Sequence, residues 1–327
     1  MTNIDLSEAI AEIKKKKARL VLLQLPEGLK TQTLSLIEEI EQKTNAKCVA
    51  LAEPCFGACD IPDLKAKQLN ADLIVHLGHS KLVDSSTQSV FIAVESELNN
   101  NKIQGLAELL AEALKKEKIS KIGLVATIQY LPALESLQKE LEKNGIIALV
   151  EASGQVLGCS YSNARALEKK TRAIVFFGDG LFHALGIAFA VKNKVFALNP
   201  LEETVKDFSV EKDKFLRQRY ALISKAAEAK SFGVLISTKK GQCRKEKALE
   251  LKQKIEENGR RAFLLAMDLF EPEYLLGINV DALVNTACPR IAIDDFARFT
   301  KPFLNPTELL IALGEKKLQD FKIDEMF

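Results

Sequence analysis

The sequence has no tryptophan and only three histidines and six cysteines among its 327 residues. It also lacks an excess of charge, since 46 basic residues balance 44 acidic ones for a net charge of +2. This balance excludes the basic surface by which proteins bind nucleic acid or anionic membranes. No apolar stretch is long enough to cross a bilayer, and the first residues, MTNIDLSEAIAEIKKKK, lack the pattern of a signal peptide. We therefore expect a cytoplasmic protein with no membrane partner and no direct nucleic-acid partner.

Two short motifs are absent as well. No closely spaced C-x₂-C pair occurs, which excludes the spacing of a zinc finger. No G-x-G-x-x-G loop follows the first apolar run, which excludes a glycine loop of the dinucleotide-binding type. In a reducing cytoplasm, cysteines with a function are metal ligands or reactive groups rather than disulfides. The six cysteines must therefore be judged by where they fall in the fold.

The sequence does contain one pattern that occurs three times. An apolar strand, a short loop, an amphipathic helix and a second strand follow one another from Val21, from Ile122 and from Phe232. Each helix carries Leu or Ile at spacings of three and four residues and ends in a turn signal, NAK, KNG or ENG. Further short apolar runs follow in each unit, as is typical of strands buried on both faces of a parallel sheet.

We therefore predict an α/β protein built from three similar Rossmann-like domains with parallel sheets. The polar segments SELNNNKI and NPLEETVKD mark the boundaries between them. In parallel sheets, functional residues gather at the carboxyl ends of the strands, because the loops there converge on one edge. The predicted domains span residues 1–103, 104–206 and 207–327.

One cysteine of each unit falls in a loop at such an edge. Cys59 and Cys159 follow the second strand of the first two units at corresponding positions, and Cys288 ends a later strand of the third. Each alone is consistent with a small buried residue, but one per repeat favours convergence on a common site. Three thiolates suit an iron–sulfur cluster with one open iron, whereas a structural zinc needs a fourth ligand. The three domains are therefore expected to surround a central iron–sulfur site.

The remaining cysteines are interpreted differently. Cys48 begins a strand and is expected to pack inward. Cys243 lies at the start of a helix, where the pKa of a thiol can be lowered, and is interpreted as a bystander. Cys55 forms a C-x₃-C pair with Cys59, so it is either a bystander or a further metal ligand.

Six motifs occur in order along the chain and together resemble one family. They are LPEGLK, EPCFGACDIP, VHLGHS, FFGDGLFHALG, KKGQ and NTACPRIAIDD, and they run from Leu25 to Asp295. The set resembles the archaeal diphthamide synthases, which are 2-(3-amino-3-carboxypropyl)histidine synthases. No C-x₃-C-x₂-C triad within one loop is present, so the fold would have to assemble the cluster.

The resemblance implies a [4Fe–4S] cluster held by Cys59, Cys159 and Cys288, with S-adenosylmethionine bound at the fourth iron. It implies cleavage of the bond between the sulfonium and the methionine γ-carbon, which yields methylthioadenosine and a 3-amino-3-carboxypropyl radical. The radical would add to C2 of a histidine imidazole in elongation factor 2, the first step of diphthamide biosynthesis. The resemblance also implies an electron donor and a homodimer.

Several polar residues near the strand ends are candidates for binding S-adenosylmethionine. Each has a structural alternative, such as a hydrogen-bonded histidine or, for Gln242, a helix cap. Asp294 and Asp295 either cap a helical turn or anchor Arg290, and Glu27 is either structural or ligand-facing. No residue is assigned a catalytic role. The candidates are His79, Ser80, Asp179, Gly180, His183 and Gln242.

Other functions remain open on the sequence. Quinolinate synthases also combine three α/β domains with a three-cysteine cluster, but they are dehydratase-type condensing enzymes that do not use S-adenosylmethionine. A non-catalytic partner subunit would have the same fold, although the presence of all three cysteines argues against a silent role. A zinc-stabilised binding protein fits the cysteine spacing poorly.

Overall fold

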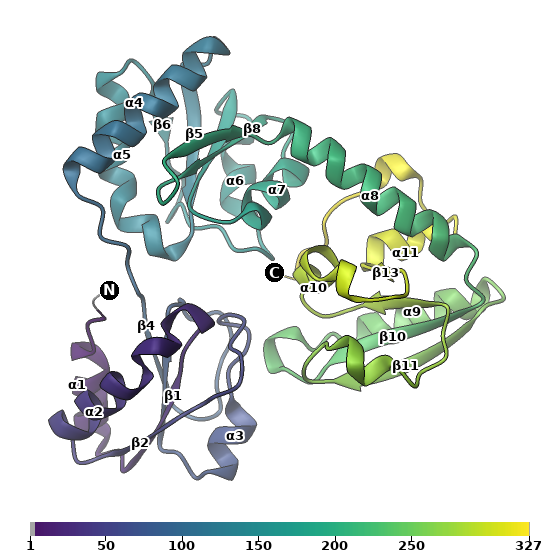
Figure 1. The fold of residues 1–327 in the computed structure, drawn as a ribbon, viewed down its shortest axis with the longest axis horizontal. Coiled ribbons are helices and arrows are strands. Elements are labelled where there is room, and N and C mark those ends of the chain that lie inside the picture. The colour runs from purple at the N-terminus through teal and green to yellow at the C-terminus, as the bar shows by residue number, and fades with distance from the viewer. Residues whose placement is uncertain (1–3, 327) are drawn as a thin grey trace. The chain divides into compact units, whose positions relative to one another are not determined.

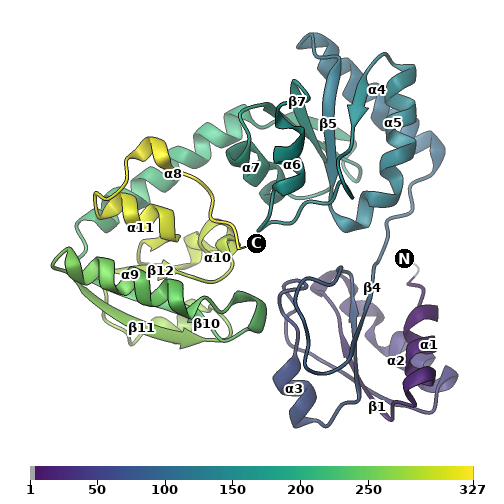
Figure 2. The same ribbon diagram turned by 180° about the vertical axis from the view of Figure 1, so that it is seen from behind.

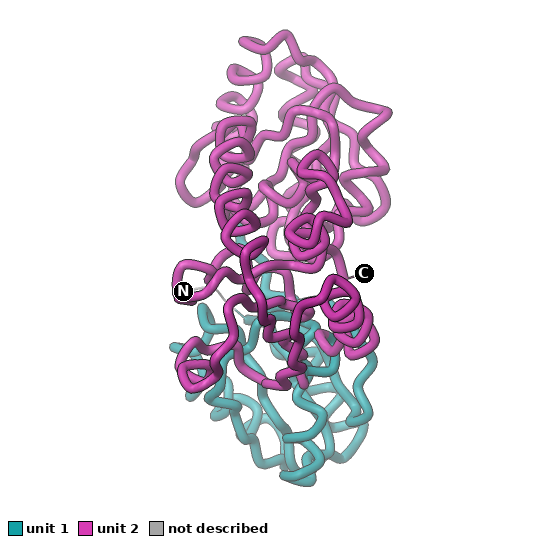
Figure 3. The backbone as a smooth tube through the Cα atoms, turned by 90° about the vertical axis from the view of Figure 1, so that its right-hand side faces the viewer, with its two compact units in different colours: residues 1–97, 239–241 teal, residues 98–238, 242–327 magenta. Residues whose placement is uncertain are grey.

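The computed structural model describes residues 4–326. These residues form two compact units, which Figure 3 colours teal and magenta. Unit 1 comprises the residues up to Glu97 together with Lys239–Gly241, and unit 2 comprises Leu98–Thr238 and the residues from Gln242 onward. Unit 1 contains one β-sheet, and unit 2 contains two.

Unit 1 is a four-stranded parallel sheet with helices on both faces (Figure 1). Val21 and Leu23 pack with helices α1 and α2 on one face, whereas Leu22 packs with α3 on the other. Successive side chains of a strand point to opposite faces, which explains why this strand is apolar throughout. The strands lie in the order β2 (Lys47–Ala50), β1 (Leu20–Gln24), β3 (Leu73–Leu77) and β4 (Ser89–Ile92), and the helices are α1 (Ser7–Lys16), α2 (Thr33–Lys43) and α3 (Asp63–Gln68).

The first sheet of unit 2 has five strands, of which the last is antiparallel. Helices α4 and α5 cover one face of this sheet, and α6 and α7 cover the other. The strands lie in the order β6 (Ile147–Leu149), β5 (Lys121–Ala126), β7 (Ala173–Phe177), β8 (Lys194–Asn199) and β9 (Thr204–Asp207). The helices are α4 (Asn100–Lys116), α5 (Leu134–Lys143), α6 (Ser162–Glu168) and α7 (Leu181–Ala190).

The second sheet of unit 2 has four parallel strands. Figure 2 shows α9 and α11 along one face, where they share a core with α8, while α10 lies on the other. The strands lie in the order β11 (Arg261–Met267), β10 (Ser231–Ser237), β12 (Ala282–Asn285) and β13 (Phe303–Leu304). The helices are α8 (Ser209–Ala227), α9 (Lys245–Glu257), α10 (Pro289–Asp294) and α11 (Pro306–Ala312).

Short 3₁₀ helices complete the described chain. They span Glu27–Gln32, Ile128–Ala133, Lys240–Gln242, Pro272–Leu275, Phe296–Arg298 and Leu318–Asp320.

The three sheets share one strand order, which confirms the predicted repeat. In each, the second strand along the chain lies at one edge, followed in space by the first, third and fourth strands. The prediction missed one element, because the polar segment NPLEETVKD contains β9, which forms an antiparallel hairpin with β8. Each sheet falls within one predicted domain range except for Asp207 at the end of β9. The exact domain boundaries remain a prediction.

Among the described residues, no helix combines the length and the apolarity needed to cross a membrane.

Candidate metal centre

The three candidate cysteine ligands all follow the carboxyl end of a strand. Cys59 lies in the loop after β2, Cys159 lies in the loop after β6, and Cys288 follows β12 and is the N-cap residue of α10. All three are partly exposed, whereas Cys55 is buried. The positions predicted from the repeat are therefore those of loops at a sheet edge, where side chains can reach a ligand.

In unit 1, the segment Lys239–Gly241 holds the backbone next to Cys59. The amide of Gly241 donates to the carbonyl oxygen of Cys59 over 3.0 Å. A Cβ atom at position 241 would lie 2.5 Å from that oxygen, so only glycine permits the approach. The ammonium of Lys239 pairs with Asp60 over 2.8 Å, and both side chains are more than 90% buried. This buried pair and the Gly241 contact fix the loop on which Cys59 sits.

In unit 2, the surroundings of Cys159 and Cys288 meet at Tyr161. The hydroxyl of Tyr161 donates to the carbonyl of Gly158 over 2.9 Å, and its ring is fully buried. Burial raises the pKa of this phenol, and negative charge on Cys159 raises it further. Negative charge on Cys288 also raises the pKa of Tyr161. Both cysteines therefore lie close enough to Tyr161 to interact with it electrostatically.

Arg290, two residues after Cys288, links the same loops. A Cβ atom at Gly158 would lie 3.5 Å from its Cδ atom, and its guanidinium lies 4.9 Å from the centre of the Phe182 ring. Its Nε donates to Asp294 over 2.9 Å. Of the two predicted roles of Asp294, the structure therefore supports the one in which it anchors Arg290.

The end of the described chain also contacts both cysteine loops. The amide of Met326 donates to the carbonyl oxygen of Cys159 over 3.0 Å. The carboxylate of Glu325 accepts a hydrogen bond from the Tyr161 amide over 3.2 Å and forms an ion pair with Arg165. This part of the tail therefore holds the residues on either side of Cys159.

The same tail reaches the strand that precedes Cys288 through one arginine. Arg244 forms an ion pair with Asp324. Its Nε donates to the carbonyl of Thr286 over 2.7 Å, two residues before Cys288. The residues from Asp324 to Met326 thus connect the Cys159 loop with the end of β12.

The remaining candidates divide between the two units. His79 and Ser80 follow β3 in unit 1 and are partly buried. Asp179 and Gly180 are exposed at the start of α7, and His183 is half-buried and stacks on the Phe176 ring. Burial, with a smaller contribution from Arg290, lowers the pKa of His183 to about 4. Gln242 is 3% exposed in a 3₁₀ helix.

The structure also describes the surroundings of the other residues singled out in the sequence. Cys48 lies in β2 and packs against the core of unit 1, and burial raises its pKa to about 12. Cys243 is exposed. Glu27 is exposed and pairs with Lys30 over 2.6 Å. Asp295 makes no side-chain cap at the short helix that follows it.

Sequence reasoning missed Lys239, Gly241 and the tail from Asp324 to Met326. The KKGQ motif drew attention only to its glutamine, although the lysine and glycine make the contacts near Cys59. The tail carries no local motif, because its role depends on arginines far away in the sequence.

Comparisons with known proteins agree with this architecture. The family model described as "Putative diphthamide synthesis protein" matches residues 25–322. A protein of Pyrococcus horikoshii named 2-(3-amino-3-carboxypropyl)histidine synthase is 34% identical, covering 99% of this chain and 93% of its own. A Methanocaldococcus jannaschii protein of the same name is 32% identical over the same shares.

A solved structure is equally similar. The crystal structure of Dph2 from Pyrococcus horikoshii with a 4Fe-4S cluster has a TM-score of 0.90 and 33% identity, covering 99% of this chain and 94% of that chain. The identities, the coverage and the family model agree with the six ordered motifs. The chain therefore belongs to the diphthamide synthesis protein family, whose curated relatives here are named as enzymes.

Proposed function

We propose that this chain is a 2-(3-amino-3-carboxypropyl)histidine synthase. It would transfer the 3-amino-3-carboxypropyl group of S-adenosylmethionine to C2 of a histidine imidazole in elongation factor 2, as the first step of diphthamide biosynthesis in the cytoplasm. The observation that carries this proposal is the match, over 99% of the chain, to a solved relative described with a 4Fe-4S cluster. That relative supports the use of an iron–sulfur cluster by this chain.

The donor set fits such a cluster. Thiolates are the ligands that iron–sulfur clusters take. Cys59, Cys159 and Cys288 are partly exposed at strand ends, so each sulfur can reach a ligand outside its own core. We propose that these three residues hold a [4Fe–4S] cluster, which supplies an electron and one open iron position for the sulfonium cosubstrate.

Several side chains of unit 2 are suited to bind the cosubstrate. Helix α7 begins beside the exposed Gly180, and backbone amides at a helix start bind carboxylates such as that of a methionine moiety. Arg290 adds a cation near the Cys159 loop, and the half-buried ring of His183 lies within reach of its charge. The buried amide of Gln242 is proposed to hydrogen-bond the nucleoside.

In unit 1, His79 and Ser80 follow β3 at the carboxyl edge of the sheet. We include them among the residues that contact the cosubstrate. The buried Phe182 and Tyr161 exclude water from the part of the site that unit 2 provides.

An anaerobic assay tests the proposed activity. Protein reconstituted with iron and sulfide is mixed with dithionite, labelled S-adenosylmethionine and elongation factor 2. We expect methylthioadenosine together with label on the factor. Cys59→Ala, Cys159→Ala and Cys288→Ala should each lose iron and activity, whereas the control Cys48→Ala should keep both.

Two outcomes would contradict the proposal. An intact cluster with no label on elongation factor 2 would favour a non-catalytic partner subunit or a quinolinate synthase-like condensing enzyme. A product mixture dominated by 5′-deoxyadenosine would mean that a different sulfonium bond is cut.

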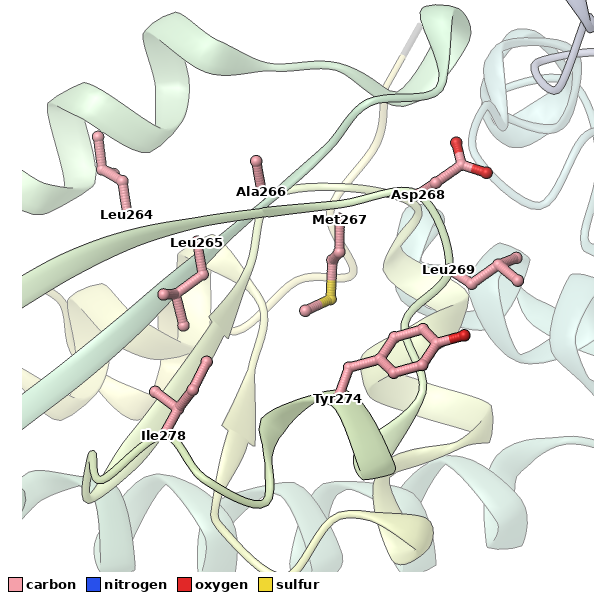
Figure 4. Close-up of a pocket in the computed structure, with 8 residues that line it drawn as sticks. All are labelled: Leu264, Leu265, Ala266, Met267, Asp268, Leu269, Tyr274 and Ile278. Carbon is pink, nitrogen blue, oxygen red and sulfur yellow. The ribbon is translucent and has the colours of Figure 1, made fainter. Parts of the chain in front are cut away.

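We also propose that the chain forms a homodimer through β11. This strand lies at one edge of its sheet, and Phe263 is 45% and Leu264 36% exposed. Figure 4 shows Leu265 and Met267 on the side of the strand that faces Tyr274, where these residues line a groove of about 560 Å³. Exposed apolar edge strands pair readily with a second chain.

The apolar centre of β11 supports self-pairing. In an antiparallel pair about a two-fold axis, the residue on the axis lies opposite its own copy, so an axis at Leu264 would place Leu264 opposite the partner's Leu264. Phe263 would then lie opposite the partner's Leu265, and this contact would occur twice, once on each side of the axis. The apolar side chains of β11 would thus pack against one another in this register.

A charge at position 264 tests this register. Leu264→Asp should raise the dissociation constant of the dimer by roughly tenfold or more, because two like charges would lie directly opposite each other and an apolar contact would be lost. Leu264→Asn, which is polar but uncharged, should weaken the dimer less, and Lys47→Glu on the edge strand β2 should have no effect. Sedimentation equilibrium measures each constant. A monomeric parent chain, or a Leu264→Asp variant that dimerises as tightly as the parent, would refute the β11 interface.

A further inference from the structure

Three metal-binding side chains of unit 1 lie together apart from the three proposed cluster ligands. They are Cys55, His76 and His79, whose potential ligand atoms all lie within 4.8 Å of one another. Cys55 is 5% exposed and His76 is fully buried. A thiol and two imidazoles gathered in the interior form a donor set of the kind that binds zinc.

Hydrogen bonds determine which nitrogen of His76 is available. The amide group of Gln24 donates from Nε2 to the carbonyl oxygen of Asp60 over 2.7 Å, which turns its Oε1 toward His76. The distance from this oxygen to His76 Nδ1 is 2.8 Å, so Nδ1 carries the proton. The lone pair of His76 is therefore on Nε2.

The lone pair faces the other members of the cluster. His76 Nε2 lies 2.9 Å from His79 Nδ1, and it accepts a hydrogen bond from that nitrogen. A metal-bound histidine usually donates its second N–H to an oxygen that fixes the ring, as His76 does to Gln24. The Phe91 ring, 5.0 Å from the His76 ring, restricts its rotation further.

The site also occupies a favoured position in the sheet. Gln24 and His76 are register partners at the carboxyl ends of β1 and β3. In a sheet with the order β2-β1-β3-β4, the strand order reverses between these two strands, and ligands bind at such switch points. The loop after β2 brings Cys55 to the same place.

We propose that Cys55, His76 and His79 bind a zinc-like divalent ion, separate from the iron–sulfur cluster. Two imidazole nitrogens on tetrahedral Zn²⁺ lie roughly 3.3 Å apart, and a thiolate sulfur lies roughly 3.6 Å from each. The present nitrogen separation is 2.9 Å, and every donor pair lies within 4.8 Å. Shifts of about one ångström or less in each side chain would complete three of the four positions, and water would take the fourth.

Binding requires two changes in protonation. The thiol of Cys55 releases its proton to solvent as the sulfur–metal bond forms. The proton on His79 Nδ1 moves to Nε2 through solvent, and its hydrogen bond to His76 is replaced by the two nitrogen–metal bonds. No oxidant or reductant is involved. Nε2 of His79 would then carry a proton. It could therefore donate a hydrogen bond to S-adenosylmethionine but could not accept one.

The ion would connect the Cys59 loop to the sheet. Cys55 lies four residues before Cys59, and His76 lies within β3. Lys239–Gly241 already hold the residues next to Cys59. A metal at Cys55 would fix the opposite end of the same loop, and it would do so whether or not the proposed reaction takes place.

The first test removes the cluster ligands. A full-length Cys59→Ser/Cys159→Ser/Cys288→Ser variant, stripped of metal by a chelator, is titrated with Zn²⁺ against a chromophoric competitor. We expect one Zn²⁺ per chain. Adding Cys55→Ser should weaken binding by more than roughly 100-fold, and adding Gln24→Ala by roughly 10–100-fold, since the latter removes only an outer hydrogen bond. Adding Cys48→Ser should change nothing.

A second measurement covers the case in which the serine variant does not fold. The parent chain with its reconstituted cluster is exposed to Zn²⁺, dialysed and analysed for both metals. We expect one zinc beside the iron, lost in Cys55→Ser while the iron stays. Absence of zinc in the parent chain, or zinc that survives Cys55→Ser, would overturn the inference. Neither result depends on labelling of elongation factor 2, so failure of this site and failure of the proposed function can be told apart.

Discussion

Replacing Arg219 by leucine is expected to lower the free energy of unfolding by about 3–5 kcal/mol, the cost of leaving one partner of a buried ion pair alone. Arg219 lies in α8, and its guanidinium is fully buried. Its Nε and a terminal nitrogen each donate to Glu308 of α11 over 2.6 Å. The variant would leave the Glu308 carboxylate buried without its counter-charge.

The remaining donors of Arg219 tie this pair to the candidate metal centre. One terminal nitrogen donates to the carbonyl of Ala292 over 2.7 Å, and the other donates to that of Phe303 over 2.8 Å. Ala292 lies in α10, the helix that Cys288 caps. Loss of Arg219 should therefore loosen the Cys288 loop as well as the core of the third sheet.

Urea unfolding of parent and variant measures the effect. The matched control is Lys254→Ala, which breaks a partly exposed ion pair with Glu315 in the same region and should change the free energy of unfolding only slightly, because solvent screens such pairs. The double variant Arg219→Met/Glu308→Leu should recover part of the loss, because it removes both charges. A single Arg219→Leu variant as stable as the Lys254→Ala control would show that the buried pair is not a determinant of the fold.

The three α/β repeats and their parallel sheets follow from patterns within short segments of sequence, whereas the shared strand order was found only in the structure. Apolar runs predict β1, β5 and β10, and three- and four-residue spacing predicts the helices that follow them. Each of these patterns lies within a short segment, so a single amino-acid sequence is enough to recognise it. The hairpin strand β9 escaped prediction because its four residues alternate between partly buried and exposed, which leaves no apolar run.

The contacts that position the candidate ligands were not predictable in the same way. Arg219 and Glu308 are 89 residues apart, and Lys239 and Asp60 are 179 apart. No periodicity links such pairs, since each depends on how separate elements pack. The sequence places Cys59, Cys159 and Cys288 at strand ends, as the structure confirms, and their meeting at one cluster remains a prediction.

Ending the chain after Ile323 is expected to lower retention of the cluster by roughly 10–100-fold, the usual effect of removing groups that orient metal ligands. The deletion removes the Glu325 carboxylate, which binds Arg165 and the Tyr161 amide, and the Met326 amide, which binds the Cys159 carbonyl. It also removes Asp324, the partner of Arg244. The loops of Cys159 and Cys288 would then lose their shared contacts.

The deletion should leave the rest of unit 2 folded, because the anchors of the tail lie upstream of it. Ile323 is 5% exposed in the core shared with α7, and Phe321 packs against Phe189. Iron content after gel filtration and the thermal midpoint measure the two effects separately. Glu325→Gln should give a smaller loss of iron, since the amide keeps an acceptor but not the charge that pairs with Arg165. The exposed control Lys322→Ala should retain full iron. A truncated chain that binds its cluster as tightly as the parent would show that the Cys159 and Cys288 loops hold their positions without the tail.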